Sequence, residues 1–226
     1  MWRVSRALIG KDLSLLLFRG SGLVQALLLG LLLIFVFSLS SGPGNPVSPQ
    51  AAAAIFWVSS LFCQVLIFNQ LYALEESHGQ RMALLLLPIL PQTIWLAKSL
   101  AGFLLLLTAQ LCFLPACLIF LGQVINAQWF STTVCGLVLV DIGIAALGSL
   151  LGAVAQGHAA RESLLSILLF PLLTPLLLAG ISLHTASFGG TVTDLDQWLM
   201  LASAFDAIFV AVSFVLFAFI YTGDES

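Results

Sequence analysis

Charged residues are scarce in this sequence. Lys, Arg, Asp and Glu make up 8% of the 226 residues, whereas hydrophobic residues make up 61%. An average soluble domain is about one quarter charged, because it must present a polar exterior to water. The composition therefore excludes a typical soluble domain, and the mean hydropathy of +1.14 predicts an integral membrane protein.

The motifs that carry common enzyme chemistry are absent as well. The sequence has no Walker A lysine loop, GxSxG, HExxH or GxGxxG, so we expect no catalytic residue and no hydrolysis of ATP by this chain itself. Energy for any driven work must then come from a partner or an ion gradient. The four cysteines lie inside apolar runs without a CxxC motif, which is typical of small core residues. We expect no metal site and no nucleic-acid partner.

Long apolar runs dominate what is present. About 20 apolar residues are needed for a helix to cross a bilayer, and the sequence offers six such runs. We predict an all-α integral membrane protein with one transmembrane domain over residues 1–226. The predicted spans cover residues 21–40, 51–72, 99–121, 131–155, 163–183 and 198–221. Residues 1–19 are mixed in polarity and indicate either an interfacial helix, which we favour, or a frayed tail.

The basic residues all fall on one side of these spans. They are found before the first span, between the second and third, and between the fourth and fifth: Arg3, Arg6, Lys11, Arg19, Arg81, Lys98 and Arg161. The other three connections contain none. The positive-inside rule places this side, and with it both termini, in the cytoplasm.

Four polar side chains are predicted near the bilayer midplane. Asp141 and Asp206 lie within the fourth and sixth runs, and Gln64 and Gln110 fall at similar depth in the second and third. Ionisable residues inside a membrane usually face a bundle interior, a cavity or a partner. Two interpretations remain open. The layer is either a polar translocation path or subunit contact, or a set of hydrogen bonds that hold helices together.

The fifth span contains two further candidates. Pro171 and Pro175 are four residues apart, and each removes an internal hydrogen bond, which predicts a kink. Such a break suits a moving element, although prolines are ordinary in membrane helices. His184 lies near the outer end of the same span. It could be an axial heme ligand or simply part of the packing.

The densest polar cluster in the interior of the chain lies in Leu74–Gln92, between the second and third spans. It contains Glu75, Glu76, His78 and Arg81, and a run of four leucines leads to Pro88. We predict a short amphipathic helix on the cytoplasmic surface whose charged residues face a docking protein. The alternative is a simple solvated connector.

Three stretches resemble the heme exporter protein B family, the membrane subunit CcmB of the cytochrome c maturation ABC complex. The matching residues are Tyr72-x-x-Glu75 with Gly79, Leu84–Pro88, Pro91 and Ile94–Ser99; Gly143–Leu150; and Arg161–Ser166 with Pro171, Leu172 and Pro175. Together with the length and the six spans, the resemblance covers essentially the whole chain.

This resemblance implies an ABC-2-type permease fold, in which the segment between spans two and three is the coupling helix that fits a groove on the ATPase. The residues so implicated are Tyr72, Glu75, Glu76, Gly79, Gln80, Arg81 and Met82, with Arg161 and Glu162 in the second cytoplasmic loop. Family members often have Phe-x-x-Asp in place of Tyr72-x-x-Glu75, and a glutamate in place of Met82. The first change keeps an aromatic residue and an acid, whereas the second removes a polar docking contact.

The resemblance also implies partners and a location. These are an ATPase (CcmA), a heme-handling membrane protein (CcmC), a small membrane peptide (CcmD) and a heme chaperone (CcmE), with two copies of this chain in a bacterial inner membrane. Heme is a possible cargo, no cofactor is bound stably, and ATP acts only through the partner. Three functions remain open: heme export or release of the loaded chaperone, an ATP-driven assembly module that carries no heme, and a permease for another lipid or polysaccharide.

Overall fold

The computed structural model describes residues 2–19, 21–40, 47–77, 88–155 and 161–222, and these ranges contain helices and no strand. The elements are α1 (Trp2–Ser14), a π-helical turn η1 (Leu15–Arg19), α2 (Ser21–Ser40), α3 (Pro49–Ser77), α5 (Pro91–Phe120), a short 3-10 helix η2 (Ala127–Trp129), α6 (Phe130–Val154), α7 (Arg161–Ser187) and α8 (Leu195–Thr222). The predicted all-helical class is confirmed.

Six of these helices, α2, α3, α5, α6, α7 and α8, are long and apolar enough to cross a membrane. They match the six predicted spans in order, but several begin earlier than predicted. The largest difference is in α5, which begins at Pro91 instead of Ser99. Proline is favourable at the first position of a helix because its missing N–H would have no partner there.

The helix α6 lies at the centre of the bundle, where it contacts α3, α5, α7 and α8. Glycines allow the close approach. The ring of Phe68 on α3 lies against both Gly102 on α5 and Gly148 on α6, and a Cβ added at either glycine would lie 2.6 or 2.4 Å from that ring. Small residues at such contacts are the usual means by which membrane helices pack closely.

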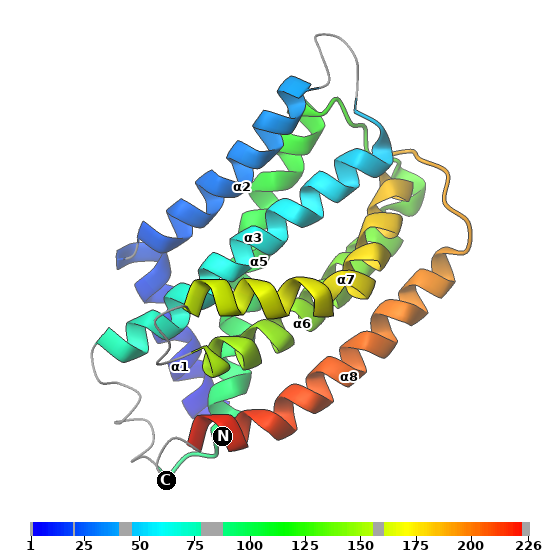
Figure 1. The fold of residues 1–226 in the computed structure, drawn as a ribbon. Helices are drawn as coiled ribbons and strands as arrows, with labels where there is room; N and C mark the ends of the chain where they lie inside the picture. Colours follow the sequence, from blue (N-terminus) through cyan, green and yellow to red (C-terminus); the bar gives the residue numbers. More distant parts are fainter. Residues whose placement is uncertain (1, 20, 41–46, 78–87, 156–160, 223–226) are drawn as a thin grey trace.

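The helices α2 and α8 lie at the edges of the bundle and carry long exposed apolar faces, as the surface of a membrane protein requires (Figure 1). The helix α7 changes direction along its length, between its yellow and amber parts in Figure 1. It contains Pro171 and Pro175, so the bend predicted for the fifth span is present. Each proline lacks the N–H that would bond to the preceding turn.

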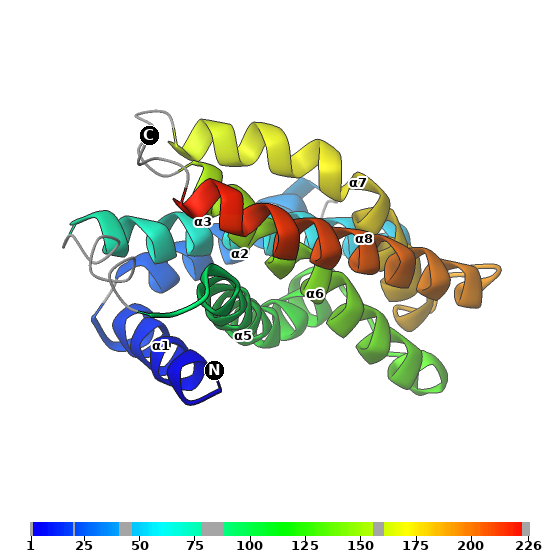
Figure 2. The same cartoon turned by 90° about the horizontal axis from the view of Figure 1, so that it is seen from below.

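The predicted N-terminal helix is present as α1, and it is attached to the bundle. Figure 2 shows α1 beside α5, and the two helices are in contact. On this helix Ser5 and Asp12 are buried, whereas Arg6 is exposed. An amphipathic helix of this kind suits a membrane interface, but one of its faces packs against protein.

Candidate functional site

A buried ion pair joins α1 to α5. The Nζ atom of Lys98 lies 3.1 Å from an Oδ atom of Asp12, and both side chains are 3% exposed. Lys98 also donates a hydrogen bond of 3.0 Å to the carbonyl oxygen of Leu71 on α3, and its ammonium lies 5.4 Å from the centre of the Tyr72 ring. One lysine therefore ties three helices together.

Further hydrogen bonds connect Tyr72 on α3 to α6. The Tyr72 hydroxyl donates to the carbonyl oxygen of Ser149 over 2.7 Å and lies 3.0 Å from its Oγ. The Ser149 hydroxyl in turn donates to the carbonyl oxygen of Trp95 over 3.5 Å, and the Trp95 indole donates to Ala146 over 3.3 Å. We call this set the inner-end network: Asp12, Leu71, Tyr72, Trp95, Lys98, Ala146 and Ser149.

The inner-end network lies where the chain enters and leaves the predicted coupling segment. The helix α3 runs on from Tyr72 to end at Ser77, and α5 begins at Pro91, a short distance before Trp95 and Lys98. A displacement of the segment between these helices would therefore act on both sides of the network. The Tyr72 ring also packs on α6 at Gly152, where an added Cβ would lie 2.5 Å from it.

The structure corrects our placement of Lys98. We predicted it in the connection before the third span, but it lies inside α5 and is buried. The signals in the sequence were a basic residue inside an otherwise apolar run and a single acid, Asp12, among four basic residues. Neither signal indicates that Lys98 and Asp12 are partners, because the two residues are far apart in the sequence. Asp12 was absent from the predicted site for this reason.

Most of the other predicted coupling residues are outside the described part of the chain. Gly79, Gln80, Arg81 and Met82 lie between the described ranges, as does the proposed amphipathic helix. Glu75 and Glu76 lie in the last turn of α3, so that helix extends further than the predicted span. Arg161 and Glu162 begin α7. The side chains of these four helical residues are not among those the structure describes.

The predicted midplane layer is partly brought together. The amide nitrogen of Gln110 donates a 2.9 Å hydrogen bond to Oδ1 of Asp141, and both residues are buried. The Asp206 carboxyl group lies against α6 at Gly143, where an added Cβ would lie 2.3 Å from its Oδ1. Gln64 is also buried, but its amide has no hydrogen-bond partner in the described part of the chain.

His184 is enclosed by aromatic residues near the outer end of α7. Its Nδ1 accepts a 3.2 Å hydrogen bond from the Trp57 indole. Its ring stacks on Phe56 with centroids 4.7 Å apart, and Phe188 lies at 6.0 Å. One ring nitrogen is occupied and the residue is 2% exposed, which favours the packing interpretation over heme ligation. Over the described ranges, no three or more His, Cys, Asp and Glu side chains are grouped to hold a metal ion.

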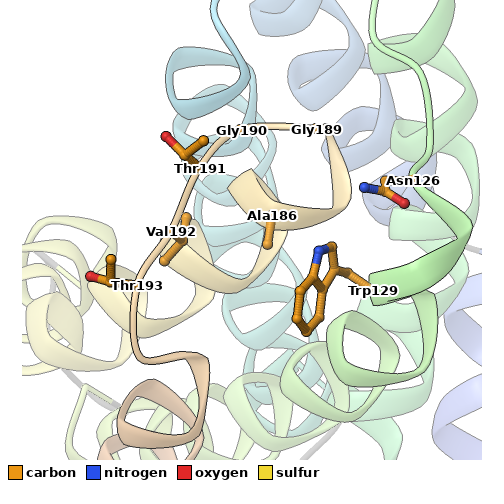
Figure 3. Close-up of a pocket in the computed structure, with 8 residues that line it drawn as sticks. All are labelled: Asn126, Trp129, Ala186, Gly189, Gly190, Thr191, Val192 and Thr193. Carbon is orange, nitrogen blue, oxygen red and sulfur yellow. The ribbon is translucent and has the colours of Figure 1, made fainter.

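A pocket of about 460 Å³ lies at the outer end of the bundle, between η2 and the connection from α7 to α8. In Figure 3 the Trp129 ring forms one wall, and the chain from Gly189 to Thr193 arches over the opening. None of the described residues that line it is charged. Its volume is within the range of small-ligand pockets, but its lining indicates no particular ligand.

Comparison with known proteins shows the family of this chain. The sequence model of the family described as "CcmB protein" matches residues 3–222. Heme exporter protein B of Rhodobacter capsulatus is 26% identical over 178 residues, which cover 79% of this chain and 81% of that protein. Heme exporter protein B of Haemophilus influenzae is 27% identical over 199 residues, which cover 85% and 89% respectively. Because the match extends from α1 to the end of α8, this chain belongs to the CcmB protein family.

Proposed function

We propose that this chain is the membrane permease subunit of an ABC-type complex that serves heme export, or the release of a heme-loaded chaperone, in cytochrome c biogenesis. The observation that carries this proposal is the family match over residues 3–222, together with two relatives named heme exporter protein B. The six candidate spans suit a multi-pass protein of the bacterial inner membrane. The uneven distribution of basic residues favours cytoplasmic termini.

Energy enters from a partner in this proposal, because the sequence contains no nucleotide-binding loop. An ATPase (CcmA) docks on Leu74–Gln92, and two copies of this chain face two ATPase subunits. When the ATPase closes, it displaces this coupling segment. The helices α3 and α5 flank the segment and carry the displacement into the membrane.

The inner-end network is the part of the bundle that turns this displacement into a concerted motion. Lys98 ties α5 to both α1 and α3, and Tyr72 ties α3 to α6. The four helices α1, α3, α5 and α6 therefore move together. Buried polar groups that are joined in this way resist separation, because each lost contact leaves an unpaired group in a dry environment.

A second function, assembly without passage of heme, is favoured by the packing of the bundle interior. The Phe68 ring fills the space between α3, α5 and α6, and Asp141 is fully buried at a neighbouring level. Motion of such a bundle would remodel a complex with the heme-handling protein (CcmC), the small peptide (CcmD) and the chaperone (CcmE). Heme would then move along a surface or between subunits.

Reconstitution in sealed vesicles separates these functions. The chain is inserted with the ATPase and the heme-handling protein, and heme-loaded chaperone is attached on the outer side. ATP-dependent accumulation of heme on the other side of the bilayer supports export. Chaperone release that depends on ATP, with no heme crossing, supports the assembly function and would overturn transport by this subunit. If ATP drives movement of a lipid or polysaccharide but neither heme accumulation nor chaperone release, both functions are overturned. The chain would then be a permease for that other substrate.

Docking through the coupling segment is tested separately by reversing charge. The double variant Glu75→Lys and Glu76→Lys is expected to lose co-purification of the ATPase, because both acids lie in the last turn of α3, where the coupling segment begins. The matched control is Asp194→Lys and Asp196→Lys, which makes the same change of charge at the start of α8. Equal recovery of the ATPase with both double variants would contradict a docking role for Glu75 and Glu76.

A further inference from the structure

Among the side chains that the structure describes, the two acids inside the bundle have no basic counter-ion at their level. Of the seven lysines and arginines in the sequence, Lys98 is the one that falls within the candidate spans, and it is already paired with Asp12. Lys98 and Gln110 lie on the same helix, roughly 18 Å apart at about 1.5 Å per residue. Asp141 is bonded to Gln110, so it is well separated from Lys98.

Asp141 is fully buried and only half satisfied. Its Oδ1 accepts from Gln110, but its Oδ2 has no hydrogen-bond donor among the described residues. The Oε1 atom of Gln110 is buried and unpartnered as well. Gln64 adds a fully buried amide from α3. Gln64 lies eight residues before Tyr72 on α3, and Asp141 lies eight residues before Ser149 on α6. Because Tyr72 is bonded to Ser149 and the two helices run in the same direction, Gln64 and Asp141 lie at one level.

Asp206 reaches the same region from the opposite side of α6. Its carboxyl group packs on Gly143, two residues from Asp141 along α6. It is 7% exposed, and neither oxygen meets a donor in hydrogen-bonding geometry within the described ranges. Among the described residues, the region therefore holds three unpartnered carboxyl oxygens and the unpartnered amide oxygens of Gln110 and Gln64. The one unpartnered donor group beside them is the Nε2 of Gln64, so the acceptors outnumber the donors.

A proton is the ligand that suits such a region. Protonation removes a charge that is costly to bury and turns one carboxyl oxygen into a donor for a neighbouring acceptor. We propose that Asp141 and Asp206 form a buried proton-binding site in the middle of the bundle, with Gln110 as the residue that positions Asp141. Each carboxylate takes up one proton from water when the contact between α6 and α8 opens, and releases it to water by the same route.

The other titratable groups on the helices packed against α6 lie elsewhere. On α3 and α5, Tyr72 and Lys98 belong to the inner-end network, and on α7 His184 is bonded to Trp57. Thr133 on α6 bonds to Leu183, which places His184 roughly 12 Å from Asp141 along the axis at about 1.5 Å per residue. The remaining titratable groups whose side chains the structure describes are the thiols of Cys63, Cys112, Cys117 and Cys135, and Asp196 near the outer end of α8. None supplies a positive charge to the pair.

Infrared spectroscopy tests this site directly, because a protonated carboxyl group has a C=O stretching band that a carboxylate lacks. The full-length chain is reconstituted in lipid nanodiscs and measured from neutral to alkaline pH. The expected result is a protonated-carboxyl band at neutral pH that is partly lost in Asp141→Asn and in Asp206→Asn, and fully lost in the double variant. The matched control is Asp196→Asn, which removes an exposed carboxyl group from the first turn of α8 and should leave the band unchanged.

Two results would overturn the proposal: no protonated band in the unaltered chain at neutral pH, or a band that survives in the double variant. If the double variant does not fold, Gln110→Leu serves in its place. Loss of the amide bond to Asp141 should shift the frequency of the band, and an unshifted band would also count against the site. The test uses neither heme nor ATP, so its outcome is independent of the function proposed above.

Discussion

Lys98 is a costly residue for its position, since an ammonium group loses several kcal/mol of solvation when it is buried. Three contacts compensate for this loss: the carboxylate of Asp12, the carbonyl oxygen of Leu71 and the face of the Tyr72 ring. A buried pair of this kind contributes little stability compared with apolar residues of the same shape, but removing one partner is expensive. Its value is therefore specificity, because it fixes how α1, α3 and α5 meet.

The first prediction concerns the loss of this pairing. Lys98→Met leaves the Asp12 carboxylate buried without its main partner and should destabilise the chain by roughly 3–5 kcal/mol. The double variant Lys98→Met and Asp12→Leu removes both charges and should recover most of this loss. Thermal unfolding of the detergent-solubilised protein measures both effects.

Lys11→Met is the matched control for that series. Lys11 also contacts Asp12, at 3.3 Å, but its side chain is 33% exposed, and exposed pairs contribute about 0–1 kcal/mol. Equal melting temperatures for Lys98→Met and Lys11→Met would contradict the buried pairing. A double variant no more stable than Lys98→Met would contradict the assignment of Asp12 as its partner.

The second prediction separates the two roles of Tyr72. Tyr72→Phe keeps the ring that packs on Gly152 and removes the hydroxyl that bonds to Ser149. A membrane hydrogen bond contributes about 0.6 kcal/mol on average, so the variant should fold and melt slightly lower. Because the hydroxyl links α3 to α6, ATP-driven activity of the assembled complex should fall while co-purification of the ATPase is retained. Unchanged activity would show that the link is not needed for coupling.

Tyr72→Leu is the control for the ring itself. It fills less of the space beside Gly152 and should lower stability by more than Tyr72→Phe, since large-to-small changes in a packed interior leave a cavity. If the two variants melt alike, the ring contributes nothing beyond the hydroxyl. The comparison thus distinguishes packing from hydrogen bonding at one position.

Among the elements, α3 and α6 pack closely at Phe68 and Gly148, and the third prediction concerns this contact. Gly148→Ala places a methyl group 2.4 Å from the Phe68 ring, which cannot be accommodated without a shift. Overpacking of this kind costs about 1–3 kcal/mol. The second change Phe68→Leu makes room and should restore part of the stability, as measured by thermal unfolding.

Gly10→Ala is a suitable control because it too lies within a helix, and an added Cβ there meets nothing within 4 Å. It should be neutral or stabilising by up to about 1 kcal/mol, which is the helix preference of Ala over Gly. Destabilisation equal to that of Gly148→Ala would mean that loss of glycine flexibility, not the contact with Phe68, is responsible.

The elements also show which features could be predicted from the sequence. The number and order of the spans follow from the length of the apolar runs, and the bend in α7 follows from Pro171 and Pro175. Helix contacts could not be predicted, because membrane helices are apolar on all sides and no polar face indicates which side is buried. The common depth of Gln110 and Asp141 was predictable by counting residues. Their hydrogen bond was not, since it depends on how α5 and α6 are rotated.

For the whole molecule, the distribution of charge is the main guide to orientation. The described inner-end residues Asp12 and Lys98 are buried and paired with each other, so the Lys98 charge is directed at Asp12 and not at the membrane surface. The exposed Arg6 on α1 still lies at this end. At the other end, Asp194 lies in the connection from α7 to α8 and Asp196 in the first turn of α8, and this connection has no basic residue. The two ends therefore still differ in sign, which favours one orientation.

The fourth prediction tests that orientation. In a variant whose four native cysteines are replaced, single cysteines are introduced at Thr193, beside the outer pocket, and at Ser14, at the end of α1. Both positions are exposed, so accessibility to a membrane-impermeant maleimide depends on the side of the membrane alone. Thr193→Cys should be labelled in intact spheroplasts, and Ser14→Cys only after the membrane is permeabilised. The reverse pattern would place Leu74–Gln92 outside the cell. A cytoplasmic ATPase could not reach it there, so the coupling mechanism would fail together with the orientation.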